Sequence, residues 1–205
     1  LPNGIQIDKD EDLHFDVKEK QNIILTVSRI GTIQKNTERF LESLAQLELK
    51  DWKVYLIGPI EKDFEPKIEL FFEKYPQLKN KINFTGPISD RQLLFDYFKK
   101  AKVFCLPSLW ESFGLVTIEA LYSGCYIVTS KSASTQDILP DPTSRTIIDP
   151  TNVTEIRDAL QKIIDSGLPN DFQPDKNRKF INDTFTWDKI TTTLGTKLNL
   201  PLRHE

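Results

Sequence analysis

A glycine-opened helix start between two glutamates is the stretch of the chain best suited to bind an anion. Residues 107–115 read PSLWESFGL and lead into a helical pattern that contains Glu119. Gly114 leaves the first amide groups of that helix open to a close anion, and these groups carry the positive end of the helix dipole. Glu111 precedes the helix, and Glu119 lies about 7.5 Å along its axis at 1.5 Å per residue. We expect a diphosphate at Gly114, with a carboxylate on either side to accept hydrogen bonds from hydroxyl groups.

The spacing of these glutamates is not specific by itself. The chain contains four glutamate pairs that are eight residues apart: Glu11/Glu19, Glu61/Glu69, Glu65/Glu73 and Glu111/Glu119. The first three fit a polar opening or a charged helix surface. Only the fourth spans a loop and a glycine-opened helix. Local sequence alone fits a ligand site and a solvated helix face equally well.

A second candidate for anion binding lies earlier in the chain. Residues 28–36 read SRIGTIQKN and place Arg29 and Lys35 six residues apart around a glycine, ahead of another helical pattern. Arginine offers a planar fork and lysine a flexible ammonium, and both suit phosphate oxygens. The alternative is a pair of solvated surface cations in a chain that holds 27 lysines and arginines.

Six short apolar runs predict the strands that would position these loops. Runs that are apolar on successive residues are typical of parallel strands covered on both faces. The predicted strands are residues 23–27, 54–57, 82–85, 103–106, 126–129 and 146–148.

Helical patterns separate the six runs. Caps are expected at Asn36 or Thr37, at Ser89 with Gln92, at Asn152 with Glu155, and at Gly124 as a helix-closing residue. Strand alternating with helix predicts an α/β fold, a Rossmann-like parallel sheet of about six strands with helices on both faces. In such a sheet ligands bind outside the carboxyl ends of the strands. Both candidate loops would lie there.

The chain divides into three predicted parts. Residues 1–21 form a polar opening, residues 22–166 the sheet domain, and residues 167–205 a carboxyl-terminal helical extension with segments around 177–183 and 187–198. The sequence contains no methionine. Because a complete translation product needs an initiator, we expect a domain taken from a longer protein.

Composition and charge exclude several classes of protein. The net charge of −3 argues against a strongly basic nucleic-acid-binding surface. No apolar run is long enough to span a bilayer, and the start lacks the features of a signal peptide. Cys105 and Cys125 lie in apolar runs, which favours reduced core thiols in a cytoplasmic protein over a disulfide.

The chain resembles a known enzyme family at these same residues. Residues 107–124, which read PSLWESFGLVTIEALYSG, are similar to the signature of the group 1 glycosyltransferases, also called glycosyltransferase family 4. Arg29 and Lys35 match the phosphate-gripping pair of that family. Further similar stretches are residues 1–5 (an interdomain linker), 84–86 (a base-side loop) and 148–150 (a late strand end). Ser28 departs from the family, which usually has glycine there.

The resemblance implies a fold, a reaction and roles for residues. The chain would be the carboxyl-terminal, donor-binding half of a GT-B fold, in a retaining hexosyltransferase-type glycosyltransferase that uses a UDP- or GDP-sugar without metal or cofactor. Glu111, Arg29 and Lys35 would be catalytic. The donor-binding set would be Arg29, Lys35, Glu111, Phe113, Gly114, Leu115 and Glu119, with Glu111 at the sugar and Glu119 at the ribose. The leaving diphosphate would be stabilised by preorganised charge.

The resemblance also implies partners. The acceptor would be a glycan or a lipid-linked sugar of polysaccharide biosynthesis, bound through an amino-terminal domain. Peripheral membrane contact would then belong to the full-length protein, and the 205-residue chain alone would be inactive.

Other readings of the sequence are weaker. Asp8-Lys9-Asp10 matches a D-x-D metal motif but lies in the polar opening, and His14 and His204 form no zinc-ligand pattern. A GT-B epimerase or phosphorylase remains an alternative, although an epimerase needs acid/base side chains in the cleft. A non-catalytic nucleotide-binding or scaffold domain is the other alternative.

Overall fold

The computed structural model describes residues 3–6, 17–131 and 135–198. The Asp8-Lys9-Asp10 motif, His14 and His204 lie outside the described residues, as does part of the predicted linker.

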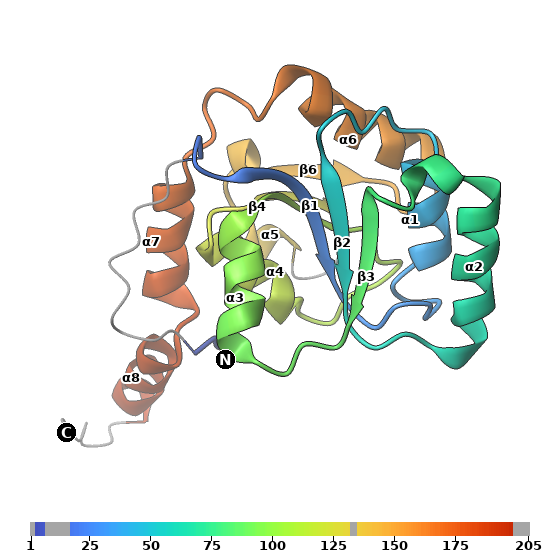
Figure 1. Cartoon of the computed structure of the whole chain (residues 1–205). Coiled ribbons are helices and arrows are strands. Elements are labelled where there is room, and N and C mark those ends of the chain that lie inside the picture. Colours follow the sequence, from blue (N-terminus) through green and yellow to red (C-terminus); the bar gives the residue numbers. More distant parts are fainter. Residues whose placement is uncertain (1–2, 7–16, 132–134, 199–205) are drawn as a thin grey trace.

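Six parallel strands form a single sheet in the order β3-β2-β1-β4-β5-β6 (Figure 1). All six predicted strands are confirmed, and each is one or two residues longer in the structure than the predicted run. Their bounds are β1 (Gln21–Val27), β2 (Lys53–Ile57), β3 (Ile82–Gly86), β4 (Ala101–Leu106), β5 (Tyr126–Ser130) and β6 (Arg145–Ile148). The Rossmann-like fold is therefore as predicted.

Helices cover both faces of the sheet, as the doubly apolar strands require. Ile24 of β1 packs into the core beneath α1 (Thr37–Leu44), α2 (Glu65–Lys74) and α6 (Val153–Ser166). Its neighbours Ile23 and Leu25 face the other core, which is covered by α3 (Arg91–Lys100), α4 (Leu115–Tyr122) and α7 (Pro174–Thr184). Figure 1 shows α1 and α2 on one side of the sheet and α3, α4 and α7 on the other. The short α5 (Thr135–Ile138) and the terminal α8 (Trp187–Lys197) complete the helices.

One of the predicted amino-terminal helix caps is confirmed and two differ. Asn152 accepts hydrogen bonds from the amides of Thr154 and Glu155, as expected. The cap of α3 is Asp90 and not Ser89, because the helix begins one residue later and the Asp90 carboxylate accepts from its first turn. Asn36 precedes α1 in a left-handed conformation and makes no capping bond with its side chain.

The first helix of the predicted extension packs against the sheet domain. Ile181 of α7 is fully buried in the core that α4 also covers, and Phe185 after it is buried there too. The main-chain amide of Ile5 donates a hydrogen bond to the carbonyl of Phe185, just after α7, at 2.8 Å. The boundary between residues 166 and 167 stays a prediction.

Both cysteines are buried free thiols in the sheet core. Burial raises the pKa of Cys105 and of Cys125. The prediction of reduced core thiols is confirmed. In the described part of the chain, no helix is long and apolar enough to cross a bilayer.

Candidate functional site

The strand order places the two candidate loops side by side. Strand order reverses between β1 and β4, and in doubly wound sheets ligands bind at the carboxyl-end crevice of such a switch point. The loop after β1 carries Arg29 and Lys35, and the loop after β4 carries Glu111. The Leu109 amide donates to the Gln34 carbonyl at 2.8 Å, and the Gln34 side chain donates to the Trp110 carbonyl at 3.0 Å. These bonds join the loops into one unit.

The left-handed residue Asn36 ties the same unit to a third loop. Its φ is 55°, and its side-chain amide nitrogen donates to the carbonyls of Pro107 and Pro150, while its side-chain oxygen accepts from Arg39 of α1. On the other flank, the Ser130 hydroxyl donates to the Ser108 carbonyl at 2.5 Å. The loop after β4 is therefore bonded to the loop after β1 and to the end of β5, and Asn36 links it to the loop after β6.

Helix α4 begins four residues after Glu111, at the end of the loop that follows β4. Gly114 has a φ of +79°, which a side-chain-bearing residue rarely adopts, and its carbonyl accepts the first bonds of the helix from Thr117 and Ile118. The amides of Leu115 and Val116 precede those bonds. A helix start of this kind attracts anions through its N–H groups and its dipole.

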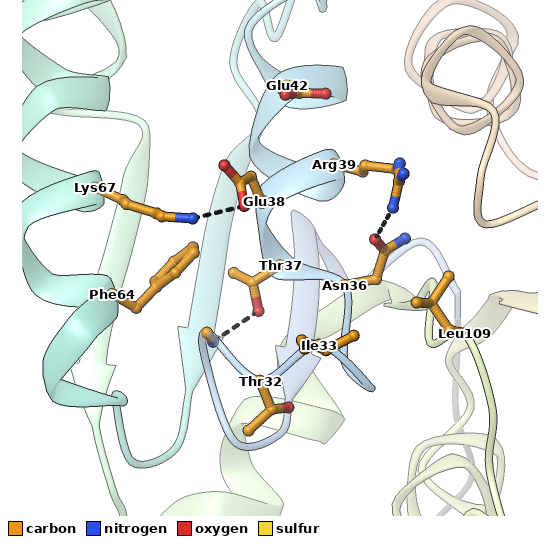
Figure 2. Close-up of a pocket in the computed structure, with 11 residues that line it drawn as sticks. Thr32, Ile33, Asn36, Thr37, Glu38, Arg39, Glu42, Phe64, Lys67 and Leu109 are labelled. Atoms are coloured by element: carbon orange, nitrogen blue, oxygen red, sulfur yellow. Dashed lines mark hydrogen bonds and ion pairs between the residues drawn. The ribbon is translucent and has the colours of Figure 1, made fainter.

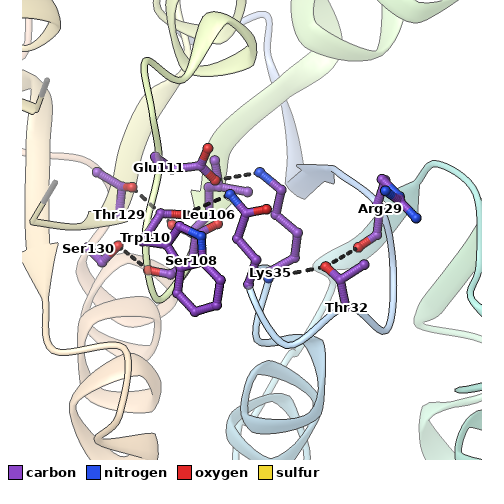
Figure 3. Close-up of polar contacts among 10 residues, drawn as sticks. Arg29, Thr32, Lys35, Leu106, Ser108, Trp110, Glu111, Thr129 and Ser130 are labelled. Atoms are coloured by element: carbon purple, nitrogen blue, oxygen red, sulfur yellow. Dashed lines mark hydrogen bonds and ion pairs between the residues drawn. The ribbon is translucent and has the colours of Figure 1, made fainter. Parts of the chain in front are cut away.

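Lys35 and Glu111 form an ion pair between the two loops. The ammonium lies 2.5 Å from Glu111 Oε1, and the side chains are only 15% and 11% exposed (Figure 3). Thr32 shapes the loop around Lys35, since its hydroxyl donates to the Arg29 carbonyl and accepts from the Lys35 amide. The structure thus brings together two of the predicted site residues.

Arg29 makes its ion pair with a different carboxylate. Its guanidinium lies 2.7 Å from Glu61 Oε1, with side chains 68% and 40% exposed. The main chains pair as well, because Ile30 donates to Pro59 and Glu61 donates to Ile30. Glu61 had been assigned to a charged helix surface, and that prediction is wrong: it lies in the loop after β2, before α2 begins.

Glu119 lies in α4 and pairs with Arg91 at the start of α3. Arg91 Nη2 lies 3.1 Å from Glu119 Oε1, and the Glu119 side chain is 14% exposed against 64% for Arg91. Burial raises the pKa of Glu119, and the nearby Arg91 opposes that rise. The remaining predicted residue, Phe113, stacks edge-on against Phe185 at 5.9 Å between ring centroids.

Sequence reasoning missed the partners of these residues. Glu61, Arg91 and Gln34 all lie in or beside loops at the carboxyl ends of strands, so the strand-end rule could have marked them. What the sequence did not supply was which loops become neighbours.

A separate pocket of about 460 Å³ lies against the loop of residues 31–33 and the start of α1 (Figure 2). Its polar groups largely pair with one another: Lys67 bonds Glu38 at 2.8 Å, and Arg39 donates to Asn36 at 3.2 Å. None of Arg29, Lys35, Glu111 or Glu119 lines it. Among the described residues, no group of three or more histidine, cysteine, aspartate or glutamate side chains could hold a metal ion.

Comparison with known families and proteins gives a consistent result. The profile of the family described as "Glycosyl transferases group 1" matches residues 8–185. The chain is 25% identical over 172 residues to the MMP alpha-(1->4)-mannosyltransferase of Mycolicibacterium hassiacum, covering 83% of this chain and 41% of that protein. It is 31% identical over 136 residues to an alpha-1,4-N-acetyl-D-galactosaminyltransferase of Campylobacter jejuni, covering 64% of this chain and 35% of that protein.

Solved structures share the fold. The sucrose-phosphate synthase of Thermosynechococcus elongatus superposes with a TM-score of 0.73 at 25% identity, over 90% of this chain and 46% of that one. HepE of Anabaena, solved in complex with UDP and glucose, superposes with a TM-score of 0.72 at 17% identity, over 89% of this chain and 49% of that one. The chain spans about two fifths of the length of the curated relatives it matches and about half that of the solved ones.

Proposed function

Because the chain belongs to the group 1 glycosyl transferases, we propose that it binds the nucleotide-sugar donor of a retaining glycosyl transfer. The observation that carries this proposal is the meeting of the Lys35–Glu111 pair and the glycine-opened start of α4 at the switch point of the sheet. One cation, one carboxylate and one set of free amides then surround a single crevice. That set suits a diphosphate with a sugar on one side.

Donor binding would exchange the ion pairs of the ligand-free site. The diphosphate takes the place of Glu111 beside the Lys35 ammonium, and its other oxygens accept from the Leu115 and Val116 amides. Glu111 is then released to accept hydrogen bonds from hydroxyls of the donor sugar. Arg29, which is mostly exposed, turns from Glu61 to the phosphates at little cost because exposed pairs are worth about 0–1 kcal/mol.

The chemical contribution of this half is to the leaving group. Negative charge develops on the departing diphosphate in the transition state, and Lys35 and the α4 amides stabilise it from fixed positions, with Arg29 added once it has turned from Glu61. The charge on these groups suffices without a metal ion, which is the basis for proposing a metal-independent and cofactor-independent reaction. Glu119 accepts from the ribose hydroxyls at the far end of the donor.

Solved relatives of the same fold support the nucleotide assignment. Separate HepE structures from Anabaena contain UDP and UDP-glucose, and we extend that ligand class to this chain as a UDP- or GDP-sugar. The acceptor would be a glycan or a lipid-linked sugar, as the names of the mannosyl- and galactosaminyltransferase relatives suggest. Because the chain spans less than half of those relatives, the acceptor site belongs in our proposal to a second domain.

A titration panel tests this function. Calorimetry of the 205-residue chain with UDP-, GDP- and ADP-sugars, the free nucleoside diphosphates and the free nucleosides should give binding that depends on the diphosphate. Equal affinity for a nucleoside and its diphosphate would contradict the phosphate site. No binding of any member of the panel would favour the scaffold alternative, and conversion of a bound nucleotide sugar to its epimer would favour the epimerase alternative.

A further inference from the structure

The third ion pair of the crevice joins two helices that sequence reasoning had not connected. We propose that Arg91 is a positioning residue for the ribose end of the donor and acts through Glu119. This inference rests on the proposed function, since it concerns the same nucleotide site.

Arg91 occupies a fixed position at the start of α3. Asp90 caps the helix by accepting from the amides of Gln92 and Leu93, which sets where the first turn begins. Strand β3 ends at Gly86, five residues before Arg91, so the helix start lies at the carboxyl edge of the sheet. Helices α3 and α4 cover the same face, and the side chain of Arg91 reaches Glu119 across their junction.

The contact holds one oxygen of a carboxylate that is otherwise poorly solvated. Arg91 Nη2 lies 3.1 Å from Glu119 Oε1, while Glu119 is mostly buried and Arg91 mostly exposed. A buried carboxylate loses the water that normally stabilises its charge, and an adjacent guanidinium replaces part of that stabilisation. The ionised form is an acceptor at both oxygens, whereas protonation turns one oxygen into a donor and removes the charge.

Two consequences follow for a ribose beside Glu119. The guanidinium keeps the carboxylate charged and fixes its rotation, so that its remaining lone pairs are directed at one place. A charged acceptor binds a hydroxyl about twice as strongly as a neutral one. Arg91 would therefore strengthen ribose binding without touching the phosphates, which the proposed function places at the start of α4, about one turn before Glu119.

The test combines a variant of Arg91 with ligands that lack the ribose hydroxyls. Arg91→Gln and the unchanged chain are titrated with UDP, GDP, their 2′,3′-dideoxy forms and inorganic pyrophosphate, by calorimetry. We expect the variant to bind the ribose nucleotide about threefold to fivefold more weakly, the range of a partly exposed ion pair. It should bind the dideoxy form and pyrophosphate as the unchanged chain does. Arg91→Lys should restore at least half of the lost affinity.

Lys100→Gln is the matched control, because it removes one exposed positive charge from the other end of the same helix. It should leave all affinities unchanged. Equal losses for the ribose and dideoxy nucleotides in Arg91→Gln would overturn the inference, and so would no loss for either. Failure of the unchanged chain to bind any nucleoside diphosphate would instead overturn the proposed function and this inference with it.

Discussion

Lys35→Ala should weaken nucleoside-diphosphate binding far more than Arg29→Ala. The two cations differ in their surroundings, since the Lys35 side chain is 15% exposed and that of Arg29 is 68% exposed. A charge-assisted hydrogen bond in a largely dry site is worth about 1.5–3 kcal/mol, or roughly 10- to 100-fold in affinity. An exposed, screened cation contributes about 1 kcal/mol or less, which is roughly fivefold at most.

Part of the loss in Lys35→Ala would come from Glu111. Without the ammonium, this mostly buried carboxylate faces the diphosphate with no cation between them. The double variant Lys35→Ala, Glu111→Gln removes that repulsion and should recover part of the affinity. The recovered part measures the repulsion, and the remainder measures the direct contribution of Lys35.

Calorimetry with UDP and GDP at low and high salt is the assay. The Arg29 contribution should fall with salt more than the Lys35 contribution, because exposed charges are screened more strongly. Lys50→Ala is the control. Lys50 also lies 2.5 Å from its carboxylate partner, Asp165, but it is half exposed and precedes the amino-terminal end of β2, whereas the candidate loops follow the carboxyl ends of strands. An Arg29→Ala loss equal to or larger than the Lys35→Ala loss would refute the reasoning from burial.

Four further outcomes follow from the structure. Glu119→Gln should weaken binding of ribose nucleotides severalfold and remove part of its pH dependence, which arises because burial raises the pKa of Glu119 and lowering the pH protonates it. Calorimetry at several pH values checks this, and Glu65→Gln should change nothing. Gly58→Ala should destabilise the fold by about 2 kcal/mol or more in urea unfolding, because its Cβ would lie 1.9 Å from a carbonyl oxygen of the neighbouring loop. Gly86→Ala, whose Cβ would meet nothing within 4 Å, should cost only about 1 kcal/mol of backbone strain. The salt bridge of Asp141 to α7 holds the pKa of that carboxyl at about 2. Its stabilisation is present above the unfolded value of about 4 and is lost as the pH falls through about 2, so Asp141→Asn should cost about 1 kcal/mol at neutral pH and only a small part of that at pH 2 in urea unfolding. Finally, the 205-residue chain should transfer no sugar to an acceptor in a radiolabel assay, since transfer requires an acceptor held in line with the donor. Transfer by the chain alone would mean that its acceptor site lies within these residues.

The fold could be predicted because its signals are local. The central strands β1 and β4 carry apolar residues in succession, as in Ile23 to Leu25, and that pattern is typical of a parallel sheet covered on both faces. A glycine at the start of α4 could be read from the sequence, but its positive φ could not, because N-cap residues usually adopt the extended region.

The pairing of side chains could not be predicted because it depends on strand order. Glu61 lies in the loop after β2, and the arrangement of β2 beside β1 is what brings it to Arg29. Asn36 shows the same limit. It looks like a helix cap, but the neighbouring Pro107 and Pro150 carbonyls hold its amide instead.

A crystal structure of the chain with bound UDP or GDP tests the central claim most directly. The phosphates should lie at the start of α4, within hydrogen-bond distance of the Leu115 amide and the Lys35 ammonium, with Glu111 released from Lys35 and the ribose at Glu119. Phosphates bound instead in the pocket beside α1, with the Lys35–Glu111 pair intact, would contradict the account.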